Sequence, residues 1–594
     1  MSTNNIYYVD MEKRFNDFRD GKMNMRMLHL MVYDADNVAF AVRQLSKSPG
    51  RMALGPDGSN YKTLENYSVM ELVEIVKDRL LSKQMDYVRR AYIPKGNTGK
   101  MRPLGICSIW DKLVEKCIQL VVEPFCETKF VVSSFGFREQ VSQHNALAKV
   151  KRQCQTMPYV LSIDLRDYFG TIDPDVTYRE LWHIGVRDQV ILNYIYRFIK
   201  KGYYEDSCKV EDPLGSPQGS ILGPLISNAY LHRFDVWLRD QGDCWHDKSV
   251  AKFHHPDNKR QNLERTNLKV GTHVRYADDI LVLCKDYQDA VRFRYSVTRY
   301  LTGNMRLEIN EDKTKIYDLT KEKMKYLGYD FYVFKKPHKQ QQDRYMVANT
   351  LPKTKEDEIV NRCDELLRII KKRPCFETIH DWNVYVVGIH NYYRGMTHFF
   401  KSFRKIGWRI KKLFYHTMNK RVKFTTEQSY KDNFHEGRYR SWGKKGYYCF
   451  ETYPVIEINW ANWDSGLICW KKCKIRENPY HYGEKKHKPG VSLEDIGYLV
   501  NTSKYIKNSR LAMFRISKYS SVKGISYLSG EHVPVEQYHC HHIKPEGKGG
   551  THDFDNLCVL SETEHNILHS NAPEQLYALF PKKKKRIKML IDAL

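Results

Sequence analysis

No stretch of this sequence is apolar for long enough to cross a membrane. A spanning helix needs about 18 consecutive apolar residues, and every apolar run in the chain is shorter than that. The first residues have neither the apolar core of a secretory signal nor the Arg-rich pattern of a transit peptide. We therefore expect an intracellular, cytoplasmic protein with no membrane partner.

Cysteine pairs, internal repeats and long low-complexity segments are missing as well. The 14 cysteines are scattered and none forms a Cys-x-x-Cys pair, which is typical of reduced thiols in a cytosol. Acidic residues are outnumbered, because 70 Asp and Glu stand against 97 Lys and Arg and leave a net charge of +27. Such an excess predicts a nucleic-acid partner. At 594 residues the chain is long enough for several domains.

The most informative segment is Tyr276-Ala277-Asp278-Asp279. Short apolar or β-branched runs flank it, so it is predicted to be the turn of a β-hairpin. Two adjacent carboxylates at a hairpin tip repel each other unless a cation lies between them. A divalent metal bound there could organise phosphoryl transfer, whereas a solvated turn is the simpler interpretation of this segment alone.

A third carboxylate, Asp164, follows the predicted buried strand 159–163. A strand that brings Asp164 beside Asp278 and Asp279 would complete the site of a palm-type polymerase. Two metal ions held by such carboxylates activate a primer 3′-hydroxyl and stabilise the leaving pyrophosphate. Further motifs surround these acids in a fixed order: Tyr92–Lys95, Lys100–Ile106, Ser134–Arg138, Asp164–Phe169, Gly215–Ser220, the Tyr-Ala-Asp-Asp turn, Asn310–Thr314 and Tyr326–Tyr329.

Together these motifs resemble the reverse transcriptase–maturases that group II introns encode, over residues 37–569. The resemblance implies an α+β multidomain protein with a right-hand polymerase, a helical thumb, a small DNA-binding region and a ββα-metal HNH domain. The boundaries that we expect are 1–86 for an N-terminal fingers extension, 87–335 for fingers and palm, 336–430 for the maturase or thumb domain, 431–520 for DNA binding, 521–570 for the HNH domain and 571–594 for a basic tail.

The resemblance also suggests which residues hold the incoming nucleotide. Lys95 and Arg102 lie on a predicted hairpin and could clamp phosphates, Arg by a bidentate fork and Lys as a point charge. Phe169 would lie under the sugar and reject a 2′-hydroxyl. Gln218 could reach the nucleotide or template through its amide, and Lys313 could give a proton to the leaving pyrophosphate. Exposed fingers charges, a core aromatic and a solvated lysine are the simpler interpretations.

Three helices are predicted in the thumb. The first, over 356–371, is amphipathic, with one apolar face: Ile359, Cys363, Leu366, Leu367 and Ile370. The second, over 381–394, ends in Asn391-Tyr-Tyr-Arg394, which resembles the maturase signature, and the third is strongly basic. Its apolar residues recur at helical spacing from Phe399 to Phe414, and no acid interrupts its cations. A run of one charge repels itself, so a phosphate backbone is the partner that we expect, with a solvated face as the alternative. The candidate RNA-binding residues are Lys401, Arg404, Lys405, Arg409, Lys411 and Lys412.

The C-terminal segment contains Tyr538-His-Cys-His541-His542, Asn556 and His565-x3-His569, which resembles an HNH nuclease. Residues four apart share one helix face, so His565 and His569 could bind one metal, with His541 as a third ligand. His542 would deprotonate the attacking water, and Asn556 would fix the imidazole of His542.

Intron-encoded HNH domains usually carry two cysteine pairs that bind a structural zinc. The corresponding stretches here are Leu528–Glu531 and Ser561–Glu564, which contain no cysteine, so structural zinc is not expected. The stretch Pro581–Lys588 resembles a nuclear import signal, but a nucleic-acid-binding tail is the interpretation that we prefer.

The sequence thus predicts an RNA-directed DNA polymerase that uses Mg²⁺ and assists splicing of its own group II intron RNA. For intron homing, it would nick target DNA at an HNH site that uses a divalent metal, for which we expect Mg²⁺. Its partners would be intron RNA, target DNA and deoxynucleotides, in a ribonucleoprotein associated with the bacterial nucleoid. A splicing-only maturase with inactive sites and a cellular reverse transcriptase are the alternatives. The sequence does not identify the intron, its DNA target or whether the protein is a monomer or a dimer.

Overall fold

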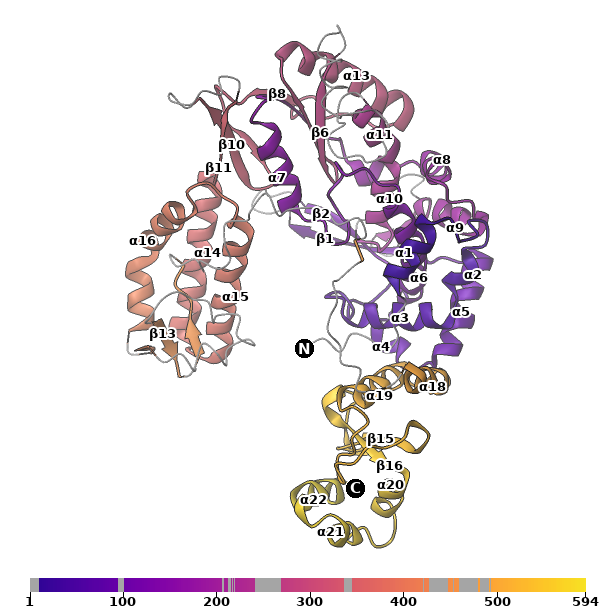
Figure 1. Ribbon diagram of the computed structural model, residues 1–594. Helices are drawn as coiled ribbons and strands as arrows, with labels where there is room; N and C mark the ends of the chain where they lie inside the picture. Colours follow the sequence, from indigo (N-terminus) through magenta and orange to yellow (C-terminus); the bar gives the residue numbers. More distant parts are fainter. Residues whose placement is uncertain are drawn as a thin grey trace.

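The computed structural model describes residues 10–94, 101–205, 208–211, 215, 217, 219–240, 269–335, 344–419, 421–426, 447–451, 453–458, 479–480, 491 and 493–594. Helices and strands are mixed throughout, in an α+β protein (Figure 1). In this part of the chain, no helix combines the length and the apolar character needed to cross a membrane.

The N-terminal region is helical. It contains α1 (Met11–Arg19), α2 (His29–Val32), α3 (Ala35–Ser46), α4 (Tyr61–Leu64) and α5 (Val69–Ser82), which pack around α6 (Ile109–Glu127). Local capping fixes where these helices begin. For example, Ser68 and Glu71 form a capping box at the start of α5, in which each side chain bonds the other residue's backbone N–H.

One four-stranded sheet, called the central sheet below, has the strand order β6-β7-β3-β8. Its strands are β3 (Tyr159–Ile163), β6 (Gly271–Tyr276), β7 (Asp279–Cys284) and β8 (Lys315–Asp318). Alternate residues of a strand point to opposite faces, and both faces of this sheet are covered. Ile280 and Val282 join the cluster that contains α13 (Tyr287–Met305), whereas Leu281 and Leu283 join the cluster that contains α7 (Gln143–Gln153).

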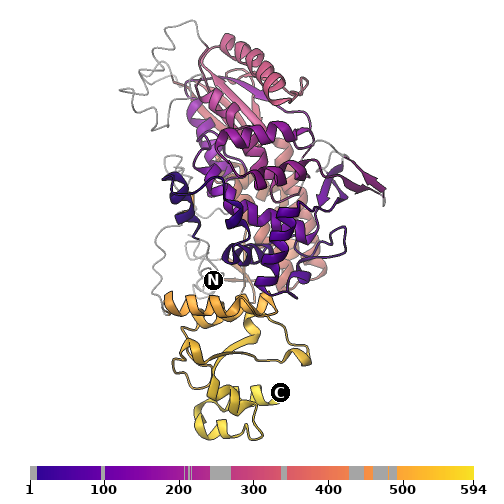
Figure 2. The same cartoon turned by 90° about the vertical axis from the view of Figure 1, so that its right-hand side faces the viewer.

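Helices α8 (Pro174–Ile184), α9 (Gln189–Ile199), α10 (Gly223–Tyr230) and α11 (His232–Asp240) link this sheet to the N-terminal helices. A second sheet, β2-β1-β4-β5, projects beside them (Figure 2). It contains β1 (Val88–Pro94), β2 (Met101–Ile106), β4 (Tyr203–Glu205) and β5 (Cys208–Val210). β1 and β2 form the predicted hairpin, with Pro94 opposite Met101.

A third region contains three long helices, as predicted: α14 (Lys353–Lys372), α15 (Phe376–Tyr393) and α16 (Phe399–Met418). The sheet of β9 (Met324–Tyr326), β10 (Tyr329–Phe334) and β11 (Met346–Thr350) joins it to the centre, and β12 (Lys423–Thr425), β13 (Tyr447–Phe450) and β14 (Tyr453–Val455) complete it. The predicted apolar face of α14 is buried: Ile359, Cys363, Leu366, Leu367 and Ile370.

The C-terminal unit lies beyond α3 and α4, at the end of the molecule away from α13 (Figures 1 and 2). α18 (Leu493–Ser503) and α19 (Ser509–Ser521) join it to the N-terminal helices, and α19 packs against α3. The unit contains the hairpin of β15 (Tyr538–His542) and β16 (Leu557–Ser561), followed by α20 (Glu562–Leu568), α21 (Gln575–Leu579) and α22 (Lys584–Ala593).

The last 24 residues form part of this unit and not a separate tail. Leu576, Ile587 and Leu590 are buried against Leu560 and Leu568, so α21 and α22 close one side of the β-hairpin. The lysines of 581–588 remain on the outer surface, where they alternate with these buried residues. The segment that we expected to be a basic tail is therefore mostly a cover for the C-terminal core.

Candidate functional sites: a carboxylate turn and a histidine triad

The strand–turn–strand prediction at 270–284 is confirmed. β6 and β7 form a hairpin in which Tyr276 pairs with Asp279, so Ala277 and Asp278 are the two turn residues. Ala277 has φ of 57°, a left-handed conformation that non-glycine residues adopt rarely. Because Ile163 pairs with Ile280, Asp164 follows β3 next to Asp279. The three predicted carboxylates therefore meet at one end of the central sheet.

A fully buried arginine, Arg275, holds this carboxylate turn from behind. Its guanidinium forms a fork with Asp235 of α11, with donor–acceptor distances of 2.8 Å and 2.6 Å. It also donates to Ser134 Oγ at 2.6 Å, to Asn228 Oδ1 at 3.1 Å and to the carbonyl of Ala277 at 2.9 Å. All five N–H donors of the guanidinium thus have acceptors, one of which is the turn itself.

The same network fixes the segment Ser134–Arg138 against the turn. Asn228 Nδ2 donates to the carbonyl of Gly136 at 2.8 Å, and the N–H of Phe135 donates to the carbonyl of Arg275. A Cβ on Gly136 would lie 2.3 Å from the backbone nitrogen of Ala277. Only glycine allows this approach. The predicted motif therefore supports the turn through its backbone.

The carboxylates interact electrostatically as the sequence predicts. Burial and the neighbouring Asp278 and Asp164 raise the pKa of Asp279 to about 6, although Lys313 opposes the shift. Lys313 Nζ lies 3.1 Å from Asp164 Oδ2. A set of three carboxylates that repel one another fits a divalent cation, which prefers oxygen ligands.

The candidate nucleotide-binding residues are described only in part. Arg102 is exposed on β2, and Phe169 is half-buried with its ring centroid 6.3 Å from that of Phe137. Lys95 and Gln218 lie outside the described residues. Pro217 packs closely against Gly105 of β2, because a Cβ built on Gly105 would lie 2.9 Å from the Cβ of Pro217. Pro217 therefore borders the β1–β2 hairpin.

The hairpin at Leu327 and Gly328 is bonded to the three-helix region. Both turn residues have positive φ, 43° and 74°. Tyr392, at the end of α15, donates its hydroxyl to the carbonyl of Leu327 at 3.0 Å, and its own carbonyl accepts from the hydroxyl of Tyr329 at 2.6 Å. The end of α15, which resembles the maturase signature, thus contacts the hairpin of the Tyr326–Tyr329 motif.

The basic helix α16 includes cations that are paired within the protein. The sequence has no acid within this helix, but α14 supplies two. Lys405 Nζ lies 3.0 Å from Glu356, and Arg409 lies 3.1 Å from Glu356 and 2.7 Å from Asp357. These two cations are therefore partly neutralised within the protein, because acids distant in sequence pack against the helix.

Four further basic candidates on α16 are exposed, as Lys405 is despite its ion pair: Lys401, Arg404, Lys411 and Lys412. Arg404, Trp408, Lys411 and Tyr415 follow at helical spacing, and Trp408 has 75% of its surface exposed. Arg404, Trp408, Lys411 and Tyr415 also line a groove together with Glu457 and Ile458. Sequence reasoning missed Trp408, although a tryptophan between cations is typical of surfaces on which bases stack.

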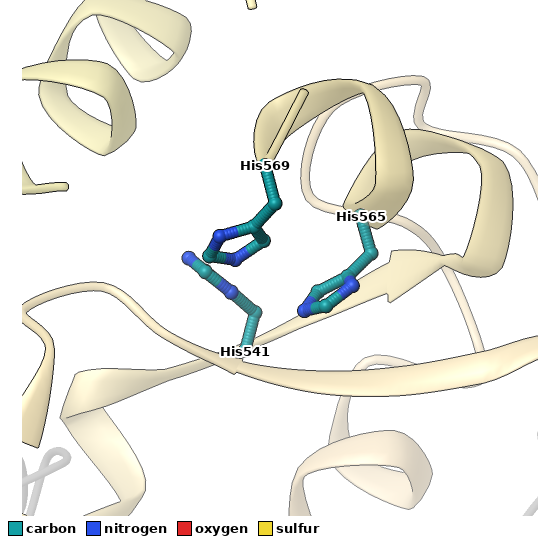
Figure 3. A group of neighbouring side chains, drawn as sticks. All are labelled: His541, His565 and His569. Carbon is teal, nitrogen blue, oxygen red and sulfur yellow. The ribbon is translucent and has the colours of Figure 1, made fainter. Parts of the chain in front are cut away.

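Three histidines meet in the C-terminal unit (Figure 3). His541 comes from β15, whereas His565 and His569 come from α20 and its C-terminal end. One ring nitrogen from each lies within 4.8 Å of the others. Burial, His569, His565 and His542 lower the pKa of His541 to about 4, and burial with His569 lowers the pKa of His565. Neutral imidazoles that converge in this way suit a divalent metal.

The surroundings of His542 differ from the prediction. We expected Asn556 to hold this imidazole, but its side chain bonds the N–H and carbonyl of Lys544 at 2.8 Å and 2.9 Å and the carbonyl of Thr551 at 2.7 Å. The hydrogen bond of His542 goes to His552, with Nε2 and Nδ1 2.9 Å apart. Asn556 therefore shapes the loop that carries His552.

The two stretches without zinc cysteines are joined by a carboxylate. Glu564 is buried, with 4% of its surface exposed. It accepts from the N–H of Ser529 at 3.0 Å, from the N–H of Ser561 at 2.8 Å and from Ser526 Oγ at 2.7 Å. Hydrogen bonds thus connect the loop 526–531 to the first turn of α20, which carries His565 and His569. Sequence reasoning noted the missing thiols but did not find this replacement.

The sheet, the acidic turn and the motifs around it define a nucleotide polymerase domain. The family described as "Reverse transcriptase (RNA-dependent DNA polymerase)" matches residues 93–331, which include the three carboxylates. "Protein YkfC" of Escherichia coli (strain K12) is 30% identical over 312 residues, which are 50% of this chain and 81% of that protein. The chain therefore belongs to the reverse transcriptase family.

Proteins of introns are among its relatives. "Group II intron-encoded protein LtrA" of Lactococcus lactis subsp. cremoris is 29% identical over 301 residues, 45% of this chain and 50% of that protein. "Putative COX1/OXI3 intron 1 protein" of Saccharomyces cerevisiae is 26% identical over 351 residues, 54% of this chain and 41% of that protein. The chain thus spans half or less of these two relatives. It is a reverse transcriptase related to group II intron-encoded proteins.

Proposed function

We propose that this chain is a group II intron-encoded protein that copies RNA into DNA, assists the splicing of its intron RNA and nicks target DNA. The observation that carries the proposal is the presence, in one chain, of a carboxylate turn within a reverse transcriptase domain and a histidine triad in a separate β-hairpin and helix unit. The first site suits polymerisation, and the second suits cleavage of the DNA strand that would supply a primer.

In the polymerase, Asp164, Asp278 and Asp279 would hold the divalent metal that reverse transcriptase domains generally use. When bound, Mg²⁺ would activate the primer 3′-hydroxyl and stabilise the leaving pyrophosphate. Lys313, whose Nζ lies 3.1 Å from Oδ2 of Asp164, would give a proton to the leaving pyrophosphate. Lys95, Arg102 and Gln218 would bind the nucleotide, and Phe169 would lie under its sugar.

In the nuclease, His541, His565 and His569 would hold a divalent metal, for which Mg²⁺ is our choice in the cell. The metal would stabilise the charge that develops on the cleaved phosphate. His542 would take the proton of the attacking water. Structural zinc is not required, because Glu564 already joins the two loops through hydrogen bonds to Ser529 and Ser561.

The exposed cations Lys401, Arg404, Lys411 and Lys412 would contact intron RNA, and the surface of Trp408 would stack a base. The net charge of +27 supports a nucleic-acid partner. The ribonucleoprotein would then meet target DNA in the bacterial nucleoid.

Primer extension on an RNA template tests the polymerase. Asp164→Ala and Asp278→Ala each remove a carboxylate from the metal site, so DNA synthesis should fall by about 10³-fold or more, the equivalent of several kcal/mol. Binding of RNA should survive, since it depends on the distant α16. Glu74→Ala, which replaces an exposed acid of α5 outside all of these motifs, is the matched control and should extend primers normally.

A nicking assay on a DNA duplex tests the nuclease separately. His542→Ala should reduce nicking by about 10²–10⁴-fold through loss of the general base. Extension of a supplied primer should remain, because the two sites lie in different regions. Normal nicking by this variant, or normal extension by Asp278→Ala, would refute the corresponding half of the proposal.

A further inference from the structure

His542 forms one end of a chain of three side chains in the C-terminal unit. Its Nε2 lies 2.9 Å from Nδ1 of His552, and Nε2 of His552 lies 3.4 Å from Oε1 of Glu546. His552 is largely buried, with a side-chain exposure of 14%, whereas Glu546 is open to solvent at 71%. The chain thus runs from the exposed carboxylate of Glu546, through the largely buried imidazole of His552, to the imidazole of His542.

This order determines where the ring protons lie. A neutral imidazole has one N–H donor and one acceptor nitrogen. The carboxylate of Glu546 favours a proton on the nitrogen of His552 that faces it, Nε2, which leaves Nδ1 as an acceptor. His542 must then donate from its own Nε2. Its Nδ1 is left as a lone pair, and this atom makes no hydrogen bond to the residues that the structure describes.

The loop that carries His552 is fixed independently of His542. The side chain of Asn556 hydrogen-bonds the backbone of Lys544 and of Thr551, both in this loop. Thr551 Oγ1 donates to Asp553 at 2.8 Å. Arg510 of α19 contacts Asp553 and also lies 2.7 Å from Glu65 in the N-terminal helices. His552 is therefore held on a braced loop, as a residue that orients another must be.

We propose that His552 is a positioning residue for the general base: it accepts the Nε2–H of His542 and so directs Nδ1 of His542 at the attacking water. This inference rests on the proposed nuclease function. Glu546 sets the tautomer of His552, and Asn556 acts only by shaping the loop. The water gives one proton to Nδ1 of His542 as its oxygen bonds to phosphorus. The bond from phosphorus to the 3′-oxygen breaks, and the 3′-oxygen leaves with the electron pair and takes a proton from solvent, so water is the only co-reactant.

Two variants separate the hydrogen bond from the bulk of the ring. His552→Leu removes the acceptor, whereas His552→Asn can present an amide oxygen near the position of Nδ1. With DNA duplex and Mg²⁺ or Mn²⁺, we expect His552→Leu to lower kcat for nicking by about 10–100-fold with little change in KM, the range for outer partners of an imidazole. His552→Asn should recover most of kcat. Lys548→Gln, in the same loop, is the matched control and should leave kcat unchanged.

A second measurement does not depend on metal or activity. In the metal-free full chain with ¹⁵N-labelled histidine rings, His542 should give a ring N–H signal protected from exchange with water, assigned by its loss in His542→Ala. The signal should be absent in His552→Leu and present in His552→Asn. Primer extension and the midpoint of thermal unfolding check that each variant is folded.

The outcomes distinguish this inference from the nuclease proposal. If the wild-type chain never nicks DNA, the nuclease proposal fails, and the ring N–H signal alone then shows whether the His542–His552 bond exists. If His542→Ala stops nicking but His552→Leu keeps the full kcat, the positioning role is wrong. Absence of a protected His542 N–H from the wild-type protein also overturns it.

Discussion

The carboxylate turn and the histidine triad are supported in different ways. The turn lies on a sheet covered on both faces, and its support is an ion pair of Arg275 and Asp235 with exposures of 0% and 1%. The triad lies on a two-stranded hairpin and α20, and its support is Glu564, which bonds the first turn of α20. The carboxylate turn thus depends on buried charge within a large core, whereas the histidine triad depends on hydrogen bonds within a small one.

This difference has energetic consequences. Removing one partner of a buried ion pair leaves the other charge in a low-dielectric interior and costs about 3–5 kcal/mol, whereas replacing both partners with apolar groups is often neutral. Removing a carboxylate that accepts several hydrogen bonds leaves buried donors without acceptors, at about 1–3 kcal/mol for such a group. The carboxylate turn should therefore be more sensitive than the histidine triad to a single substitution in the residues that support it.

The largest effect is expected from Asp235→Asn. It leaves Arg275 charged and without its carboxylate, so the free energy of unfolding of the central region should fall by about 3–5 kcal/mol. Primer extension should also fall, because the guanidinium would no longer be aimed at the carbonyl of Ala277. Urea denaturation followed by circular dichroism, together with primer extension, measures both effects.

A double variant sharpens this prediction. Asp235→Leu with Arg275→Met removes both charges, so much of the lost stability should return. DNA synthesis should stay low, since Ser134 and Ala277 would still lack their donor. Recovery of both stability and synthesis would mean that the ion pair contributes nothing to the geometry of the turn.

A smaller and more local effect is expected from Glu564→Ala. Loss of the acceptor for Ser529 and Ser561 should destabilise the C-terminal unit by about 1–3 kcal/mol. Hydrogen exchange in the full chain should accelerate at 526–531 and 561–569 and remain unchanged in the central sheet. Glu562→Ala, an exposed acid in the same turn of α20, is the matched control. Equal exchange in both variants would refute the bridging role of Glu564.

Local patterns predicted much of this structure from the sequence. The apolar flanks of 270–284 predicted the hairpin, and the apolar spacing of 356–370 predicted α14. The histidine spacing also brought His541, His565 and His569 together correctly. Each of these signals lies within a short segment, or depends on one long-range pairing that the hydrophobic pattern enforces.

Contacts between polar residues far apart in sequence could not be predicted in the same way. Arg275 bonds Asp235 and Asn228, which are 40 and 47 residues away, and Lys405 pairs with Glu356, which is 49 residues away. The spacing of residues within a helix or strand gives no information about such pairs. A signal did exist for Arg275, because a charged residue inside a strand with buried neighbours needs a partner. In α22, the lysines concealed the apolar spacing of Ile587 and Leu590.

The smallest effects are expected on α16, where paired and exposed cations share one helix. Arg404→Ala with Lys411→Ala should reduce the slope of log affinity for RNA against log salt by about 0.7–0.9 for each lost phosphate contact. Lys405→Ala with Arg409→Ala should change the slope less, because Glu356 and Asp357 already neutralise much of their charge. Filter binding at several salt concentrations measures both slopes.

Trp408→Ala separates stacking from charge on the same surface. It should weaken RNA binding by about 1–3 kcal/mol per stacked base and leave the salt slope unchanged, since no phosphate contact is removed. Tyr505→Ala, which changes an exposed aromatic on another region, is the control for nonspecific loss of aromatic surface.

If the paired cations changed the slope as much as the exposed ones, RNA would have to displace Glu356 and Asp357 on binding. The contrast between neutralised and available charge on α16 would then be wrong.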